Sequence, residues 1–426
     1  MKWPIKGLTV AILRNDISSK YRLKILEGEK DMNFNINDHV TWVGKTDWEL
    51  RSFHGEEYST HRGSSYNSYL VRDQKNALID TVWQPYTTEF IDGLKQEIDL
   101  NRIDYIIANH AEIDHSGALP ELMKLIPDKP IYCTDNGIKS LKGHYHRDWN
   151  FVPVKTGDRL PLGDRELVFV EARLLHWPDS MFTYLTGDNI LFSNDAFGQH
   201  YASEFRYNDE VDRAELFQEA LKYYANILTP FSRLVEQKIN ELIGLGLPVS
   251  MICPSHGIIW RDQPMQIVEQ YLKWSQNYHE DQVTIIYDTM WNSTRRMAEA
   301  IGEGIKSANP GLEIKLFNSA RSDKNDAITE VFKSKALLVG SPTVNRGILS
   351  SVAGILEEIK GLGFKGKRGA AFGSIGWSGE SVKVINDKLV EAGFELLNDG
   401  IKAYWSPDKS ALEECRAFGK KVGEII

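Results

Sequence analysis

Cysteine is scarce in this chain, and the three cysteines that occur are far apart. Among 426 residues only Cys133, Cys253 and Cys415 are present, and no two of them form a C-x-x-C pair. This spacing excludes a four-cysteine iron or iron–sulfur centre within the chain and argues against a disulfide framework. We expect all three to be small buried apolar side chains in a protein of a reducing, cytoplasmic compartment.

Long apolar runs and an excess of positive charge are missing as well. No run approaches the roughly 18 residues that a membrane span requires, and the apolar stretch in "MKWPIKGLTVAILRND" is followed by no small-residue cleavage site. The net charge is -9, whereas nucleic-acid binding requires a basic surface. We therefore expect no membrane span, no signal peptide and no nucleic-acid partner.

The length and the order of apolar segments predict more than one domain. Residues 1–35 are expected to form an N-terminal extension. In residues 36–279, short β-rich runs such as "NALIDTV", "IDYIIANH" and "ELVFVEA" alternate with turns, and the stretch from Asp212 to about Leu245 has helical spacing. This pattern predicts a layered α/β sandwich with chemistry at its strand ends.

Residues 280–426 show a different and stricter pattern. The strands "VTIIYDT", "LEIKLFN", "ALLVGSP" and "RGAAFGSIG" alternate with helical segments, including residues 294–307 and 380–392. Strict β-α alternation indicates a doubly wound parallel sheet.

Residues with side chains that bind metals follow four apolar strands of the first domain. The segment "NHAEIDHSG" alone is equally consistent with a hydrogen-bonded turn before a helix. Three further residues of this type each follow a strand of their own, a pattern that ordinary exposed polar residues do not explain. The full set is His110, Glu112, Asp114, His115, His176, Asp195 and His256.

This set provides four imidazoles and three carboxylates and no thiolate, which is enough for two metal ions if one carboxylate bridges. A zinc hydrolase of this layout would favour a third histidine at position 112. Glu112 adds a hard anionic oxygen, which suits iron. Two iron ions are therefore predicted, and zinc remains an alternative.

Three loops of the second domain follow the first, third and fourth parallel strands: "DTMWNSTRRMA", "SPTVNRG" and "GSIGWSGE". Hydroxyls, amides and a helix N-terminus can bind a phosphate dianion without a lysine, and Trp377 can lie flat on an isoalloxazine ring. One such loop alone is common in helix capping, whereas three in order resemble a flavodoxin domain that binds FMN. The candidate FMN-binding residues are Thr289, Met290, Trp291, Asn292, Ser293, Thr294, Ser341, Pro342, Thr343, Asn345, Ser374, Gly376, Trp377, Ser378 and Gly379.

The order H-x-E-x-D-H followed by His176, Asp195 and His256 resembles the diiron domain of flavodiiron proteins, which has a metallo-β-lactamase-like αββα fold. The segments "HWPDSMFTYLTGD", "LFSNDAFGQHY" and "YYANILTPFSRLV" resemble the flavorubredoxin branch of that family in particular. The resemblance implies that His110, Glu112 and His176 hold one iron, that Asp114, His115 and His256 hold the other, and that Asp195 bridges them. It also places His54 and Tyr223 near the iron pocket, where they would assist proton transfer.

The resemblance further implies that electrons pass from FMN to the diiron centre, where NO is reduced to N2O or O2 to water. NO is the preferred substrate by the flavorubredoxin likeness, and an O2 reductase with little NO activity is the runner-up. Two interpretations from different functional classes are a zinc hydrolase with an accessory flavodoxin domain and an electron-transfer module without gas turnover. The electron donor is expected to be a rubredoxin or a rubredoxin reductase. A head-to-tail homodimer, or a dimer of dimers, is expected as the assembly.

Overall fold

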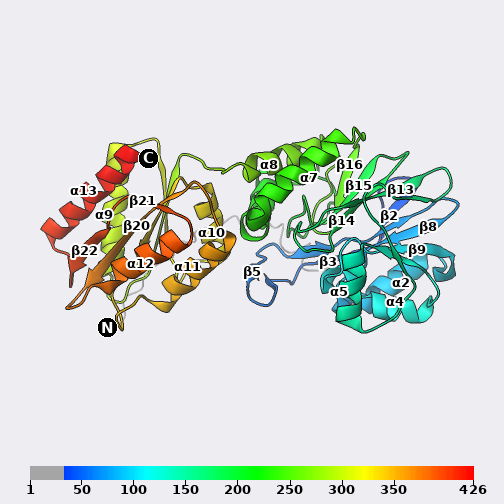
Figure 1. Cartoon of the computed structure of the whole chain (residues 1–426), viewed down its shortest axis with the longest axis horizontal. Coiled ribbons are helices and arrows are strands. Elements are labelled where there is room, and N and C mark those ends of the chain that lie inside the picture. Colours follow the sequence, from blue (N-terminus) through cyan, green and yellow to red (C-terminus); the bar gives the residue numbers. More distant parts are fainter. Residues whose placement is uncertain (1–32) are drawn as a thin grey trace, which may run out of the picture.

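The computed structural model describes residues 33–426, and residues 1–32 lie outside the described part. The described chain forms two α/β units side by side along its longest axis (Figure 1). The prediction for residues 1–35 therefore lies almost wholly outside the described residues. Its last part differs from the structure, since Phe34–Asn35 form a strand that pairs with Thr41 and Trp42. Within residues 33–426 no helix is long and apolar enough to cross a membrane.

Two sheets face each other in the first unit. The seven strands of one sheet follow the order β1-β2-β7-β8-β9-β10-β11; their bounds are Phe34–Asn35, Val40–Trp42, Tyr69–Val71, Asn76–Ile79, Ile103–Ile107, Ile131–Cys133 and Phe151–Pro153. The other sheet has the order β12-β13-β14-β15-β16; its strands are Arg159–Pro161, Glu166–Glu171, Met181–Leu185, Ile190–Asn194 and Met251–Pro254. Two small hairpins add β3 (Lys45–Asp47) paired with β6 (Ser64–Tyr66), and β4 (Ser52–Phe53) paired with β5 (Tyr58–Ser59).

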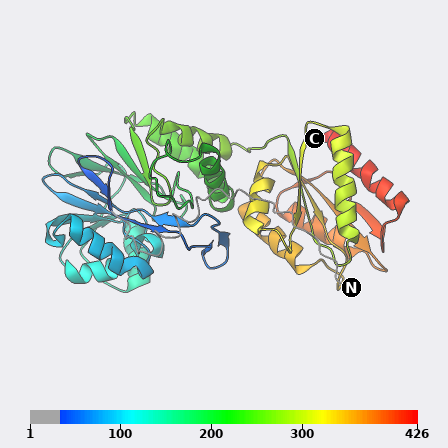
Figure 2. The same cartoon turned by 180° about the vertical axis from the view of Figure 1, so that it is seen from behind.

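Apolar side chains from both sheets fill the space between them. Trp42, Tyr69 and Ile79 of the first sheet pack with Phe169 and Phe192 of the second in one buried cluster. The outer faces are covered by helices (Figures 1 and 2). The helices on the side of the first sheet are α2 (Thr87–Glu97), α3 (Ile113–Ser116), α4 (Leu119–Leu125) and α5 (Asp135–Tyr145), with the 3₁₀ turns η1 (Gln84–Tyr86) and η2 (Leu100–Arg102). The predicted αββα sandwich is thus confirmed.

The segment predicted as one helix from Asp212 to about Leu245 is interrupted. It consists of α6 (Arg213–Tyr223), a π-helical turn η3 (Tyr224–Leu228), a 3₁₀ turn η4 (Thr229–Phe231) and α7 (Ser232–Gly244). Pro230 explains the break, because a proline in a helix interior removes a backbone hydrogen bond and clashes with the preceding turn. The last helix of the unit is α8 (Met265–Ser275).

The second unit is the predicted doubly wound sheet, with all its strand pairs parallel. The strand order is β18-β17-β19-β20-β21, with β22 also beside β20, which is the flavodoxin-like order. In chain order its elements are β17 (Gln282–Tyr287), α9 (Ser293–Ala308), β18 (Glu313–Asn318), α10 (Lys324–Lys333), β19 (Ala336–Gly340), α11 (Ser350–Leu362), β20 (Arg368–Ile375), α12 (Glu380–Glu391), β21 (Glu395–Leu396), β22 (Ile401–Tyr404) and α13 (Lys409–Ile425).

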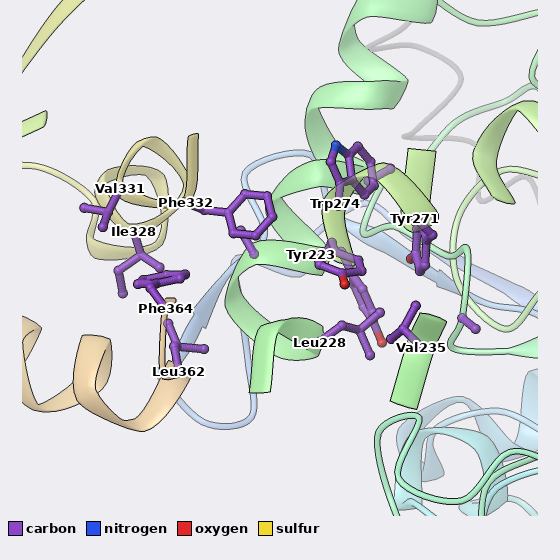
Figure 3. Packing of buried hydrophobic residues seen from close by; sticks show 14 of the residues in the cluster. Tyr223, Leu228, Val235, Tyr271, Trp274, Ile328, Val331, Phe332, Leu362 and Phe364 are labelled. Carbon is purple, nitrogen blue, oxygen red and sulfur yellow. The ribbon is translucent and has the colours of Figure 1, made fainter. Parts of the chain in front are cut away.

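The two units share a continuous apolar cluster. Ile328 and Phe332 of α10 and Phe364 after α11 belong to the same buried cluster as Tyr223 and Trp274 of the first unit. Figure 3 shows Phe332 pointing from α10 toward Trp274 and Tyr223. The second unit is therefore packed onto the first by its helix α10 and is not merely tethered by the segment between α8 and β17.

Candidate functional site

The predicted metal-binding residues converge from four strand ends. The loop after β9 and the short helix α3 provide four of them, and the segments after β13, β15 and β16 provide one each. These strands belong to the two facing sheets, and the ends of the strands meet at this point. Five residues of the set are buried and two are half-buried; the set is His110, Glu112, Asp114, His115, His176, Asp195 and His256.

Within the set the structure forms two groups whose ligand atoms lie within 4.8 Å of one another. In the first group Glu112 Oε2 is 3.2 Å from His110 Nε2 and 3.6 Å from His176 Nε2. Asp195 Oδ2 faces the same two nitrogens, at 3.7 Å and 3.4 Å. Two imidazoles and two carboxylates thus surround one point.

The second group lies on the other side of Asp195. Asp114 Oδ2 is 3.1 Å from His115 Nε2 and 3.0 Å from His256 Nε2. Asp195 Oδ1 faces these two nitrogens at 3.0 Å and 3.5 Å. The two oxygens of Asp195 therefore face different groups, which is the arrangement of a carboxylate that bridges two ions.

The spacing and the unsatisfied atoms both fit a pair of metal ions. Ligands about 2.0 to 2.2 Å from one ion, at angles near 90–110°, lie about 3.0 to 3.5 Å apart, as most of these atoms do. Both carboxylate oxygens of Asp114, both of Asp195, and Nε2 of His115 are buried and make no hydrogen bond of good geometry, although several of them lie 3.0–3.1 Å from one another. Buried polar atoms are almost always satisfied, and a cation placed between these atoms would satisfy them together.

The electrostatics of the pocket also favour cations. Burial alone would lower the pKa of His115, but Asp114 and Asp195 outweigh it and raise the pKa to about 9. Burial would raise the pKa of Asp195, yet His115 and the other imidazoles hold it well below its usual range. Imidazoles bind metals only when neutral, so ions that enter this pocket must displace protons from it.

Three residues that support the site were not predicted from the sequence. Asp179 accepts hydrogen bonds from His110 Nδ1 (2.9 Å) and from the backbone N–H of Ala111 (2.7 Å). The carbonyl of Ser65 lies 2.7 Å from His256 Nδ1. Both contacts hold an imidazole so that its Nε2 faces the pocket, a role that such outer contacts commonly have. A signal for Asp179 was available, since it follows His176 by three residues in "HWPDS".

The third is His200, which is fully buried beside the pocket. Its ring lies 4.9 Å from that of His256 and 5.4 Å from that of Tyr223. Its Nδ1 contacts Ser64 Oγ at 2.7 Å, and its Nε2 has no hydrogen-bond partner. Burial, with His256 next in effect, holds the pKa of His200 well below its usual range, so this imidazole is neutral.

The structure places His54 beside Glu112 and Tyr223 beside His200. His54 Nε2 is 3.0 Å from Glu112 Oε1; burial lowers the pKa of His54, but the contact with Glu112 outweighs it and the pKa is raised. Tyr223, at the end of α6, is 2% exposed. Burial and then Asp195 raise its pKa well above the usual range, so its hydroxyl stays protonated and can donate a hydrogen bond.

The predicted FMN-binding residues occupy the same end of the second sheet. Thr289 to Asn292 lie between β17 and α9, and Ser293 and Thr294 begin α9. Ser341 to Asn345 follow β19, and Ser374 to Gly379 end β20 and lead to α12. Two hydrogen bonds join these loops: Thr294 Oγ1 lies 3.0 Å from Ser374 Oγ, and the N–H of Thr343 donates to the carbonyl of Ser374 at 3.0 Å. The structure thus assembles all three loops into one surface.

This surface fits a flavin phosphate and ring. No side chain caps α9, and its first turn has no acidic residue, whereas aspartates cap α6, α10 and α13. The hydroxyl of Thr289 beside it is buried without a partner. Free N–H groups at a helix start and an unpaired hydroxyl suit a phosphate. Trp291 and Trp377 are 87% and 89% exposed, so both rings are available to a flat ligand.

Trp405 was not predicted and lies at the same surface. Its ring centre is 5.9 Å from that of Trp377, and its backbone N–H donates to the carbonyl of Ile375 in β20. Trp405 was missed because the strand β22 that precedes it was not predicted from the sequence, and the residues around Trp405 form no ligand-binding motif.

Comparisons with known proteins agree with both halves of the site. Residues 65–257 match the family described as ODP family beta lactamase, and residues 285–419 match flavodoxin. The chain is 57% identical over 393 residues to the anaerobic nitric oxide reductase flavorubredoxin of Escherichia coli O1:K1 / APEC, covering 92% of this chain and 82% of the relative.

Solved structures give the same result. The rubredoxin oxygen:oxidoreductase of Desulfovibrio gigas superposes with a TM-score of 0.90 at 37% identity, covering 92% of this chain and 98% of the other. The flavodiiron protein of Giardia intestinalis has a TM-score of 0.88 at 34% identity, with 92% and 96% covered.

Proposed function

Because this chain belongs to the flavodiiron proteins, we propose that it is an oxidoreductase that takes electrons from an external donor and, with FMN and a non-haem diiron centre, reduces NO to N2O. The observation that carries the proposal is the position of Asp195, whose two oxygens face two separate groups of imidazole and carboxylate ligands. Membership of this family also sets aside the zinc hydrolase and the plain electron-transfer module.

In the proposed arrangement His110, Glu112 and His176 hold one iron, and Asp114, His115 and His256 hold the other; Asp195 bridges the two. The carboxylates would neutralise two cations that otherwise repel each other. The metals would supply electrons and a binding position for the gas, while FMN would accept electrons from the donor and release them one at a time. The loops at Thr289–Thr294, Ser341–Asn345 and Ser374–Gly379 would hold the FMN.

The chain's own residues would supply and place protons. Conversion of two NO molecules to N2O and water consumes two electrons and two protons. His54 is 34% exposed and hydrogen-bonded to Glu112, so it can receive a proton from solvent and present it at the pocket. Tyr223 is buried beside His200, and burial and the charge of Asp195 keep its hydroxyl protonated, so it can donate a hydrogen bond to a bound oxyanion. We propose these as their roles.

Reduction of O2 to water is the second candidate. It is favoured by the close structural match to a rubredoxin oxygen:oxidoreductase, whereas the higher identity to flavorubredoxins favours NO. The names of these relatives also support a rubredoxin, or a rubredoxin reductase, as the electron donor. A head-to-tail homodimer or dimer of dimers, and a cytoplasmic location, stay predictions.

One set of measurements tests the proposal. The iron and flavin content of the purified protein should be close to two irons and one FMN per chain. With a rubredoxin and its NADH reductase as donor, anaerobic NO consumption with N2O release should match or exceed O2 consumption. Strong O2 consumption with negligible NO consumption would make O2 the substrate. Zinc in place of iron, or no gas consumption, would refute the proposed function.

A further inference from the structure

A small hairpin of the first unit reaches toward the second unit. It consists of β4 and β5, residues 52–59, which pair only with each other and through two residues each. It projects from the first unit toward α10 in both views (Figures 1 and 2). A two-stranded hairpin is at best marginally stable alone, so its position depends on what it contacts.

This hairpin forms one wall of the metal pocket. His54 directly follows β4, at φ 53°, and contacts Glu112. The Phe53 ring lies 4.7 Å from that of His200 and 5.7 Å from that of His256. Tyr58 is 3% exposed, and its ring lies 5.1 Å from that of His200. A shift of the hairpin would therefore move His54 relative to Glu112.

Among the contacts of the second unit with the hairpin, one buried amide bonds to the hairpin backbone. Asn325, in the first turn of α10, is 2% exposed. Its Oδ1 accepts a hydrogen bond from the backbone N–H of Ser59 at 2.9 Å, and its Nδ2 donates to the carbonyl of Glu57 at 3.1 Å. Nδ2 also donates to Asn226 Oδ1 in η3 at 3.0 Å. Both ends of this side chain are thus used, and two of its three bonds fix the backbone of the hairpin.

Helix α10 is itself firmly placed. Asn226 Nδ2 donates to the carbonyl of Asn325 (3.2 Å) and to Thr329 Oγ1 (3.0 Å). Behind these bonds, Ile328 and Phe332 are buried in the cluster shared by the two units (Figure 3). The helix cannot move away without exposing that cluster, so it is a rigid support for the hairpin.

The other contacts to the hairpin are weaker candidates for this role. Lys324 pairs with Glu57 and Glu358, but Glu57 is 73% exposed and exposed ion pairs contribute little. Asp323 Oδ1 accepts from Ser59 Oγ at 2.9 Å, yet it fixes a side chain rather than the backbone.

We propose that Asn325, a residue of the flavin-binding domain, is a positioning residue for the metal pocket of the other domain. It fixes the backbone at Glu57 and Ser59 and thereby keeps His54 against Glu112. The catalytic part of this inference rests on the proposed function. The FMN domain then has a second role, because it completes the wall of the pocket to which it supplies electrons.

Hydrogen exchange on the whole, metal- and flavin-loaded protein tests the structural part. Asn325→Ala should speed exchange in a peptide spanning residues 52–61 by about tenfold or more, since it removes hydrogen bonds that fix this backbone. Asn325→Asp keeps the acceptor for the Ser59 N–H and should give a smaller increase. Thr329→Val is the matched control: it lies on the same helix, is buried and contacts Asn226, but it does not touch the hairpin. It should leave exchange in residues 52–61 unchanged.

A double-mutant cycle tests the catalytic part. Asn325→Ala should lower gas turnover about tenfold or more with iron and FMN retained, because a displacement of about 1 Å at a reacting group is costly. In a His54→Ala background the same substitution should change turnover less than about twofold, since its target is gone. A loss of folding alone would act equally in both backgrounds. Effects that multiply, or unchanged exchange in residues 52–61 of Asn325→Ala, would overturn the proposal. If the wild type consumed neither gas, the proposed function would fail, while the exchange data would still decide whether Asn325 holds the hairpin.

Discussion

Asp179 is the residue whose substitution tests the metal site most directly without removing a ligand. Its Oδ2 accepts from His110 Nδ1 at 2.9 Å and from the backbone N–H of Ala111 at 2.7 Å, and its side chain is fully buried. Asp179→Asn keeps the shape and one acceptor oxygen but removes the negative charge. We expect weaker iron binding and retained FMN, because the flavin loops belong to the other domain.

The size of the effect follows from the two hydrogen bonds. A bond to a charged group contributes about 1.5–3 kcal/mol and a neutral one about 0.5–1.5 kcal/mol. Neutralising Asp179 should therefore weaken each bond by about 1 kcal/mol, or about 2 kcal/mol together. At about 1.4 kcal/mol per factor of ten, this corresponds to a loss in iron affinity of about 30-fold. Outer contacts of metal-binding histidines typically have effects of 10- to 100-fold, roughly the same range.

The assay is anaerobic competition for Fe²⁺ with a chelator of known affinity. Asp188→Asn is the matched control, because Asp188 also pairs with a histidine, His39 Nδ1 at 3.2 Å, and belongs to neither ligand group. It should leave iron affinity unchanged. An Asp179→Asn protein with iron affinity within about threefold of the wild type, or an equal loss in Asp188→Asn, would refute the reasoning.

Three further substitutions follow from the structure. Asp195→Asn removes the anion between the two ligand groups, so most of the iron should be lost on purification while about one FMN per chain remains. Elemental analysis and flavin extraction measure the two contents. A normal iron content would contradict a bridging role for Asp195. Trp377→Ala should weaken FMN binding about 2- to 13-fold, the equivalent of about 0.5–1.5 kcal/mol of ring contact, and it should change stability little because Trp377 is 89% exposed. Trp48→Ala, in the other domain, is the control, and equal flavin affinity in both variants would remove Trp377 from the site. Lys367 gives a pH prediction, since burial lowers its pKa to about 7 while three backbone carbonyls accept from its Nζ. Between pH 7 and 10 the Lys367 amine would be protonated in the unfolded chain and neutral in the folded chain. The free energy of unfolding of the wild type relative to that of Lys367→Met should therefore rise with pH, by up to about 1.4 kcal/mol per pH unit. Urea unfolding at pH 7 and pH 9 measures this difference in free energy, and an equal difference at both pH values would mean that the carbonyls keep the amine protonated.

Local patterns in the sequence account for the fold class. Strict β-α alternation after residue 280 encodes a parallel sheet, because parallel neighbours require a crossover connection. They were less reliable for the segment from Asp212 to Leu245, which has helical spacing throughout. There Pro230 explains the interruption, and the π-helical turn η3 next to it contacts α10, about 100 positions away in the sequence.

The chemistry of the site was also readable from the sequence, residue by residue. His176, Asp195 and His256 each follow an apolar strand, and strand ends of one layered fold meet at an edge, so their types and order predicted a metal pocket. The loops around Thr289 and Trp377 predicted the flavin surface by the same reasoning. The sequence thus shows which kind of side chain lies at the end of each strand or helix.

Only the tertiary structure decided how these side chains act together. Three features are of this kind: the opposite facing of the Asp195 oxygens, the orientation of His110 by Asp179, and the hold of Asn325 on Glu57 and Ser59. They are contacts between residues that are 19 to 268 positions apart. Such contacts leave no periodicity in the sequence, because each depends on how two independently formed elements are packed. The sequence by itself thus determined which chemical groups the protein has and at which strand ends they lie; the packing of two sheets and two domains decided their distances, their protonation and their support.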